Sequence, residues 1–444
     1  MKINLSPSPS CGALRSATTL TTLLLCGSLS AQTQLVKPPV AQYWMDVATM
    51  SMAGMDEMPS MGGGLAGMIG GMAGVPGMGG ASFGATRGMM PGRWLDLAVV
   101  TQRKPAGTEA TQTIPSGQAM GPNLTLLPVV VQPQVKTQGE RAPREAGEVP
   151  ERPKGRMLFY WGCSETVLPG QPRVLDFSTA GAADYGKFMM GRAVRDSGAK
   201  ADPGHSIWPN EKHRQNVPKE ASLVGQHAIS GEGLPESLKF AIGQQQDFMP
   251  KLGINSNGGG AAAIALNWQT LPTARAYFLS AMSGSEGEMV IWSSSDVPEP
   301  GWGLMDYASN ANVDKWLQEK VLLPANRTQC AIPAGIFAKA QGAMLRGIAY
   351  GSELNLVHPP RPSDPRVAWE QEWVARVRVK SVTMVTLGED GQQGSRSSSR
   401  SSKESTENPP RDTGTGQDTK TEETKSLVPG LPDVGKALKG LFGR

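Results

Sequence analysis

The chain has few aromatic residues, few cysteines and histidines, and no long apolar run beyond its N-terminal leader. Aromatic residues make up 6% of the 444 residues, whereas glycine and proline number 54 and 35. Because glycine raises the entropy cost of ordering a chain and proline interrupts regular structure, we expect a good part of the chain to lie outside a packed core. No later segment offers the roughly 18 consecutive apolar residues of a membrane helix. We therefore expect no transmembrane span after the leader is removed.

An excess of charge of one sign is also lacking. The formal net charge is +4, and it falls to about +2 when Lys2 and Arg15 leave with the leader. Nucleic-acid binding requires a concentrated basic face, because phosphate neutralisation supplies much of the affinity. We therefore do not expect nucleic acid as a partner.

The first 31 residues have the layout of a secretory signal. Lys2 and Arg15 provide positive charge, and residues 20–29 form a short apolar run. Small residues then lead to Ala31, which offers a signal-peptidase site before Gln32. This run is too short for a spanning helix. The pattern predicts export to a periplasmic or extracellular, oxidising compartment.

Cysteine usage fits export. Cys11 and Cys26 leave with the leader, so Cys163 and Cys330 remain. Two cysteines in an oxidising compartment most simply form one disulfide. The alternative role of Cys26, a lipid anchor, requires a small residue before the cysteine, and Leu25 is not small.

Residues 32–131 are predicted to form an N-terminal β segment. Residues 43–48 and 93–98 share the order Trp, apolar, Asp, apolar, Ala, and alternation puts Trp and Asp on one face and the apolar residues on the other. We expect two neighbouring strands. The Gly/Met-rich insert between them, residues 50–91, lacks a strand or helix period and is expected to be a mobile loop. Residues 124–131 are a further strand candidate.

A Pro- and charge-rich linker is predicted for residues 132–155, followed by a turn-rich β region over residues 156–236. In that region, residues 157–161 and 173–177 read as strands, whereas residues 179–233 give no assignable pattern.

Residues 237–387 alternate short apolar runs with turns, which favours an immunoglobulin-like antiparallel sandwich. The expected strands are residues 238–242, 264–268, 276–281, 289–292 and 373–380. In the last of these, Trp373, Ala375, Val377 and Val379 alternate with Arg376, Arg378 and Lys380, which predicts a half-exposed strand. One short helix is expected over residues 312–322, with Asn312 as its cap.

The C-terminal tail, residues 388–444, is expected to be disordered. Between residues 389 and 426 there is no aliphatic, aromatic or sulfur-containing residue, so the segment cannot bury enough surface to fold. Residues 431–442 allow a short terminal helix, which would contact a membrane surface or a partner, or would remain a frayed end.

Methionine is concentrated in the insert. Eleven of the 22 methionines fall between residues 45 and 90, and Met52, Met55, Met58 and Met61 repeat every third residue. Thioether sulfur is a soft ligand for Cu(I) or Ag(I), so these four residues are a candidate metal site. The alternative is a low-complexity loop in which methionine merely tolerates flexibility.

Catalytic motifs are missing, and no cofactor is indicated. There is no nucleophile elbow, no His-Glu-x-x-His helix and no phosphate-binding loop. His205, His213, His227 and His358 have no standard zinc spacing, and surface or hydrogen-bonded roles are favoured for each. A cleft that placed His205 or His213 beside a carboxylate and a serine would indicate a hydrolase.

Two resemblances to known families are present. Trp268, Pro272, Ala274 and Tyr277 resemble the region between the second and third strands of a fibronectin type III domain, over roughly residues 238–295. That resemblance implies a Trp and a Tyr packed between two sheets, and a binding or scaffolding role. Residues 152–156 leading to Trp161-Gly162-Cys163, and residues 359–362 leading to Trp369 and Trp373, are similar to a group of exported proteobacterial proteins of unknown function. This second resemblance implies export and architecture only.

Together these features predict an exported, non-enzymatic protein of the Gram-negative cell envelope with a binding or structural role. Its partner would be a protein or another envelope component. Soft-metal binding by the methionine run is the alternative, and an envelope hydrolase is the third possibility.

Overall fold

The computed structural model describes residues 34–53, 81–130, 154–259, 261–285, 287–340 and 342–388. The predicted leader and C-terminal tail lie outside these residues, apart from Gly388, and so does almost all of the predicted linker. Within the described residues the protein is mainly β, as predicted, with two α-helices.

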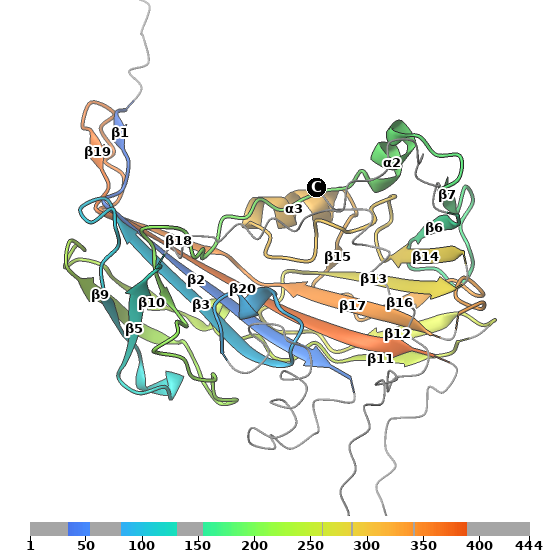
Figure 1. Ribbon diagram of the computed structural model, residues 1–444, viewed down its shortest axis with the longest axis horizontal. Helices are drawn as coiled ribbons and strands as arrows, with labels where there is room; N and C mark the ends of the chain where they lie inside the picture. Colours follow the sequence, from blue (N-terminus) through green and yellow to red (C-terminus); the bar gives the residue numbers. More distant parts are fainter. Residues whose placement is uncertain are drawn as a thin grey trace, which may run out of the picture.

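A large mixed sheet runs through the molecule (Figure 1). In spatial order its strands are β10 (Lys239–Ile242), β9 (Gly225–Gly231), β4 (Ala110–Thr113), β5 (Asn123–Pro128), β8 (Ser206–Trp208), β3 (Gly92–Thr101), β2 (Ala41–Met52), β20 (Trp373–Leu387), β17 (Ala343–Tyr350), β13 (Ala276–Ser285), β14 (Glu288–Ser293), β6 (Arg156–Trp161) and β7 (Arg173–Asp176). Two more strands pair at its side, β15 (Leu323–Pro324) with β13 and β18 (Leu354–His358) with β20.

Smaller elements complete the fold. A three-stranded antiparallel sheet contains β11 (Ile254–Asn257), β12 (Ile264–Trp268) and β16 (Gln329–Ile332), and β1 (Val36–Lys37) pairs with β19 (Trp369–Glu370). The α-helices are α2 (Ala182–Met189) and α3 (Asn310–Gln318), and the 3₁₀ turns are η1 (Ala85–Arg87), η2 (Ser116–Gln118) and η3 (Gln244–Gln246).

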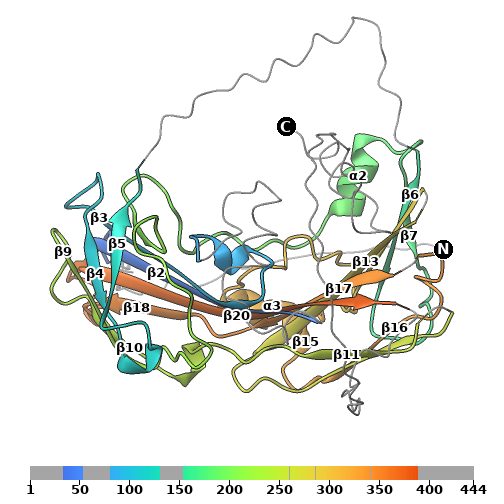
Figure 2. The ribbon, with the colours of Figure 1, turned by 60° about the horizontal axis from the view of Figure 1, so that its bottom comes forward.

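The long strands β2 and β20 connect the two ends of the molecule. They pair in parallel over twelve residues, Ala41–Met52. Figure 2 shows them crossing from the group that contains β4, β5, β9 and β10 to the group that contains β13, β17, β11 and β16. The main hydrophobic core follows them from end to end, since it includes Tyr43 near the start of β2 and Leu387 at the end of β20.

The predicted pair of Trp-x-Asp strands is confirmed. β2 and β3 are antiparallel neighbours, with Asp46 opposite Asp96. Tyr43, Met45 and Val47 enter the main core, whereas Asp46 lies on the other face of the sheet. The predicted strands at residues 157–161, 173–177, 264–268 and 289–292 are also present, with bounds shifted by at most one residue.

Four expectations about local structure are wrong. The insert is not irregular throughout, because Met50 and Met52 belong to β2 and residues 85–87 form η1. The region without an assignable pattern contains α2, β8 and β9, so there are two helices rather than one. The helix predicted over residues 312–322 is α3, which begins at Asn310 and ends at Gln318. Its cap is Ser309 and not Asn312, because the Ser309 side chain accepts a hydrogen bond from the Asn312 amide at 3.3 Å. The fourth error, the half-exposed strand, bears on the candidate site.

Candidate functional site

Charged side chains gather on the face of β2, β3 and β20 that lies opposite the main core. Asp46 on β2 receives two hydrogen bonds from Arg378 on β20, at 2.7 Å from Nε and 2.6 Å from Nη2. Both residues are buried, with 1% and 3% of their surface exposed. The prediction that Arg378 and Lys380 face solvent is therefore wrong, because segments distant in sequence cover this face. Arg376 is partly exposed, as predicted.

Residues 306 and 307 form one part of the cover. Lys380 Nζ donates to Asp306 Oδ1 at 2.7 Å, and it lies 4.2 Å from the centre of the Tyr307 ring. The Arg378 guanidinium lies 4.4 Å from the same ring. Burial lowers the pKa of Lys380 to about 8, although the Asp306 carboxylate opposes that shift. Tyr307 thus covers two cations, which its ring face stabilises.

Arg87 of η1 connects the covering segments. Its guanidinium lies 3.4 Å from Asp46, 2.8 Å from Asp196 and 3.1 Å from Asp306. Since these carboxylates come from β2 and from two separate loops, one side chain joins three parts of the chain. A planar guanidinium with five donors is suited to this role.

Asp96 on β3 holds the turn that contains Arg87. Its carboxylate accepts from the Gly84 amide at 2.9 Å, the Thr86 amide at 3.3 Å, and the Thr86 hydroxyl. Burial raises the pKa of Asp96 to about 6, and the hydrogen bonds from Thr86 and Gly84 oppose the shift. The chain that returns from the Gly/Met insert is therefore attached to the sheet by a buried carboxylate.

We predict that Asp96→Asn changes the pH dependence of stability. A folded-state pKa above the unfolded value means that the folded protein binds the proton more tightly, so this group destabilises the fold increasingly as the pH rises from about 4 to about 6. Asparagine cannot ionise. The difference in Tm, variant minus wild type, should therefore increase between pH 4 and pH 7. The increase corresponds to at most about 3 kcal/mol in the free energy of unfolding. Thermal unfolding followed by circular dichroism at several pH values tests this, and a Tm difference that does not change with pH would contradict it.

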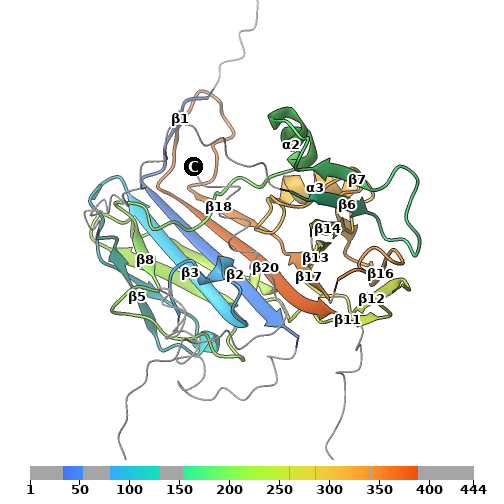
Figure 3. The same ribbon diagram turned by 45° about the vertical axis from the view of Figure 1, so that its right-hand side comes forward.

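The segment that links α2 to β8 forms the other part of the cover, and Figure 3 shows it passing over the sheet near β18. The Ala199 amide donates to Asp46 Oδ2 at 3.2 Å, and the Ser197 carbonyl accepts from Arg376 Nη1 at 3.0 Å. Gly198 lies directly on the ion pair, where an added Cβ would overlap the Arg378 guanidinium. Glycine at this position allows the backbone to approach the charges closely.

Gly198→Ala is therefore expected to destabilise the protein by about 1–3 kcal/mol, the usual cost of overpacking. The methyl group would force the segment off the sheet or displace Arg378 from Asp46. Chemical denaturation measures the change. The matched control is Gly186→Ala in α2, where an added Cβ meets open space. Equal midpoints for the Gly198 variant and wild type would show that the segment does not rest on the ion pair.

Beside the charged cluster lies a pocket of about 530 Å³. Its floor comes from β2, β18 and β20, and its wall comes from the segment between α2 and β8. The side chains that line it include Gln42, Trp44, Asp196, Ser197, Lys200, Asp202, His205, Asn355, Val357, Val374 and Arg376. The strand register brings these floor residues together, because Trp44 pairs with Arg376 and Gln42 pairs with Val374 across β2 and β20. The pocket is therefore built on the most extensively paired strands of the protein.

His205 lies in this pocket with Ser197, Asp196 and Asp202, which is the combination that would indicate a hydrolase. Its ring packs on Trp44, with 5.4 Å between ring centres. His205 Nδ1 is buried without a hydrogen-bond partner among the described residues. Among the described residues, no hydrogen bond joins the His205 ring to Ser197 or to either carboxylate. The residue types are gathered, but the nucleophile–base–acid hydrogen bonds of a triad are not formed.

The other three histidines lie elsewhere. His227 is buried and hydrogen-bonded, with Nδ1 3.2 Å from Gln112 Nε2 and Nε2 2.8 Å from the Leu223 carbonyl. Burial lowers the pKa of His227. His358 stacks on Trp373, with 5.5 Å between ring centres, and His213 is exposed.

The candidate soft-metal site remains a prediction. Met52 is the last residue of β2 and pairs with Met384 of β20, whereas Met55, Met58 and Met61 lie outside the described residues. Within the described ranges, no three His, Cys, Asp or Glu side chains come together as metal ligands.

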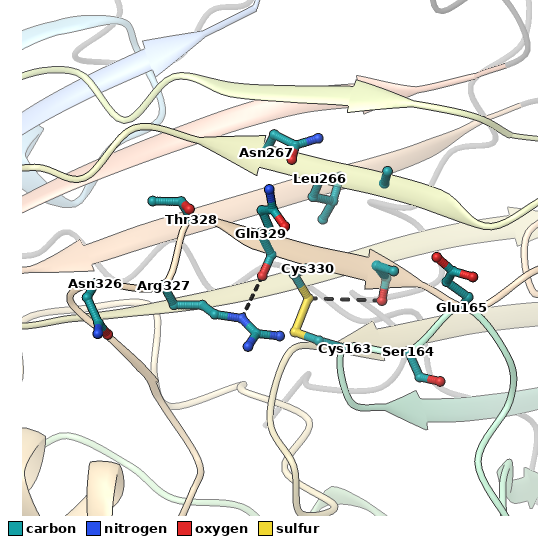
Figure 4. Close-up of a pocket in the computed structure, with 12 residues that line it drawn as sticks. Cys163, Ser164, Glu165, Leu266, Asn267, Asn326, Arg327, Thr328, Gln329 and Cys330 are labelled. Carbon is teal, nitrogen blue, oxygen red and sulfur yellow. Dashed lines mark hydrogen bonds between the residues drawn. A yellow bond between two sulfur atoms is a disulfide. The ribbon is translucent and has the colours of Figure 1, made fainter.

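The two cysteines lie in a second groove, of about 450 Å³, at the edge of the three-stranded sheet (Figure 4). Cys163, just after β6, is joined by a disulfide to Cys330 on β16, the pairing expected from the sequence. The Ser164 amide donates to the Ala331 carbonyl at 3.0 Å, and Arg327 Nε donates to the Gln329 carbonyl at 2.7 Å. In this groove the two cysteines, the Ser164 amide and Arg327 Nε are thus already bonded to other groups of the same chain.

The charged cluster was missed from sequence although its parts were visible. Two aspartates on one face of β2 and β3, and three cations on one face of β20, are complementary sets. Alternation identified both faces, but it carries no information about which strands become neighbours. The parallel pairing of β2 with β20, across more than 300 residues of sequence, brings them together.

Among the helices that the structure describes, none combines the length and apolar character needed to cross a membrane. The chain matches no protein-family model, no curated protein and no solved structure.

Proposed function

We propose that this chain is an exported, non-enzymatic protein of the cell envelope that binds a ligand or partner in the pocket over β2, β18 and β20. The observation that carries the binding role is the polar lining of that pocket. The side chains of Gln42, Trp44 and Asp202 line it without a hydrogen-bond partner among the described residues. Preformed pockets with a few convergent polar groups are the usual small-molecule sites of proteins.

The rigid surroundings of the pocket support the same role. The wall segment is held to the sheet by Asp46, Arg87 and Arg376 through the contacts described above. A binding site gains affinity when its walls are positioned before the ligand arrives, because less conformational entropy is lost on binding. A buried ion cluster next to the pocket supplies such positioning.

Export is supported by the leader, residues 1–31, and by the disulfide between Cys163 and Cys330. The immunoglobulin-like region was expected over residues 237–387, but β10 (Lys239–Ile242) pairs with β9. We infer further that the unit comprises residues 254–387. In support, Trp268 on β12 and Tyr277 on β13 pack between the two sheets with ring centres 5.7 Å apart. Ile254 on β11 also lies against Gly347 on β17. This is the packing that the fibronectin type III resemblance implies.

A hydrolase is the second candidate, and the gathering of His205, Ser197 and two aspartates in one pocket favours it. A substrate would have to reorient His205 toward Ser197, since their hydrogen bond is absent among the described contacts. Ser197→Ala separates the two possibilities, because it would abolish hydrolysis of an ester substrate while leaving ligand binding almost unchanged.

The proposal is tested by expressing the full chain in a Gram-negative host and fractionating the cells. We expect the mature protein to begin at Gln32 and to be recovered in the periplasmic, envelope or extracellular fraction. A Leu23→Arg, Leu24→Arg variant, which interrupts the apolar run of the leader, should stay in the cytoplasm with its leader intact. A wild-type protein that keeps its leader and stays in the cytoplasm would overturn the proposal.

A further inference from the structure

We infer that the pocket over β2, β18 and β20 binds a neutral saccharide. This inference rests on the proposed binding function and names the chemical class of the ligand. Three properties of the pocket lead to it: its balanced charges, its set of polar groups without a hydrogen-bond partner among the described residues, and the apolar surface between them.

The charges in the pocket are balanced. Lys200 and Arg376 bring two positive charges, and Asp196 and Asp202 bring two negative ones. Lys200 Nζ lies 3.6 Å from Asp196, which is also held by Arg87 at 2.8 Å. An ion of either sign would be repelled by charges of its own sign in the same pocket, so the ligand is expected to be neutral.

Arg376, on the β20 part of the floor, is already held by the protein at two of its three nitrogens. Its Nε lies 2.8 Å from Asn355 Oδ1 and 3.4 Å from Glu353 Oε1, and its Nη1 donates to the Ser197 carbonyl at 3.0 Å. An anion bound to the rest of the guanidinium would lie in a pocket that two carboxylates also line. We therefore assign Arg376 mainly to shaping the pocket.

The remaining polar groups of the pocket differ in whether they donate or accept hydrogen bonds. The Trp44 indole N–H can only donate, the Asp202 carboxylate can only accept, and the Gln42 amide does both. None of the three side chains has a hydrogen bond within the described residues, and His205 Nδ1 is buried without one. A hydroxyl group both donates and accepts, so a ligand with several hydroxyls can satisfy this mixed set.

Apolar surface lies among these groups. Val374 and Val357 are paired neighbours on β20 and β18, and Trp44 lies two strands from Val357 on the same floor. A pyranose ring presents C–H groups on its faces and hydroxyls at its rim. The floor can therefore pack against the ring face while Gln42 and Asp202 form hydrogen bonds with the hydroxyls at the rim. A purely polar or purely apolar ligand could make only one of these two kinds of contact.

The inference is tested by isothermal titration calorimetry of the mature protein with four neutral disaccharides, namely N,N′-diacetylchitobiose, maltose, cellobiose and lactose, and with glucuronic acid. We expect saturable binding of at least one disaccharide. Gln42→Leu and Asp202→Ala should each weaken that binding at least tenfold, and Trp44→Phe should remove the ligand-induced change in tryptophan fluorescence. Gln329→Leu, in the disulfide groove, is the matched control and should bind as wild type does.

Folding is not expected to limit these variants, because the replaced side chains make no hydrogen bonds to the described protein, and thermal unfolding checks this. Saturable binding of no disaccharide, or binding that survives both Gln42→Leu and Asp202→Ala, would overturn the inference. Glucuronic acid binding that Gln42→Leu removes would also overturn it, but would leave the proposed binding function intact. Failure of the proposed function has a different signature, namely a protein that keeps its leader and stays in the cytoplasm.

Discussion

Replacing Asp46 with alanine is expected to lower the free energy of unfolding by about 3–5 kcal/mol, the usual cost of leaving a buried charge without its partner. Arg378 is only 3% exposed, and both of its hydrogen bonds to Asp46 would be lost. Its charge would therefore stay buried without this carboxylate. The Ala199 amide would lose its acceptor as well. Urea denaturation measures the change in midpoint and in the extrapolated free energy.

A double-mutant cycle identifies the cause of that loss. If the unpaired arginine is responsible, Asp46→Ala combined with Arg378→Met should be less destabilised than Asp46→Ala alone, because no buried charge of this pair remains. Asp364→Ala is the control, since it removes an exposed carboxylate 2.7 Å from Arg366 and should change the midpoint little. Additive losses from the two single substitutions would contradict the assigned role of the pair.

Removal of the disulfide is the second large effect. Cys163→Ser with Cys330→Ser opens a loop with a sequence separation of 167 residues, for which the chain-entropy model predicts a loss of about 5 kcal/mol. The bond also connects β6 at one end of the large sheet to β16 in the three-stranded sheet. We expect the variant to unfold at a clearly lower urea concentration than the oxidised wild type.

Reduction of the wild-type protein provides an independent measurement. Reduced wild type and the double serine variant should share one denaturation midpoint, below that of the oxidised protein. Free thiol at both cysteines in peptides from the purified, non-reduced protein would contradict the disulfide itself. Coincident midpoints for oxidised and reduced protein would instead show that the bond adds no stability.

The two effects are expected to differ in what they do to ligand binding, because only the charged cluster lies beside the pocket. The charged cluster holds the wall segment through Asp46, Arg87 and Asp196, whereas the disulfide lies in the other groove. Disruption of the ion pair should therefore weaken ligand binding as well as folding. Loss of the disulfide should lower stability with less effect on the pocket.

The strands were the most predictable part of the fold. Residues 43–48 and 93–98 alternate apolar and polar side chains, and this period matches the pleat of a strand whatever the strand pairs with. We predicted that the two strands are neighbours because their sequences are similar, and β2 and β3 pair in the structure. The region after residue 179 could not be assigned because α2, β8 and β9 are short, with eight, three and seven residues, and turns separate them.

The candidate site was less predictable. Surface or hydrogen-bonded roles were favoured for both His205 and His213, and His205 lines the pocket whereas His213 does not. Gln42, Trp44 and Asn355 were not singled out, because isolated polar residues on strands carry no distinctive spacing. Their convergence depends on the pairing of β18 and β2 with β20.

By itself, the sequence determined the period of most strands, the two faces of β2, β3 and β20, and the expectation that Cys163 pairs with Cys330. These are local or compositional properties, and neighbouring residues decide them. The tertiary structure alone decided that the polar face of β20 is buried, that Asp46 meets Arg378, and that the segment after α2 covers them. The reason is physical: a charged face is stable inside a protein only when distant segments supply its counter-charges and exclude water, and alternation along one strand contains no information about those segments.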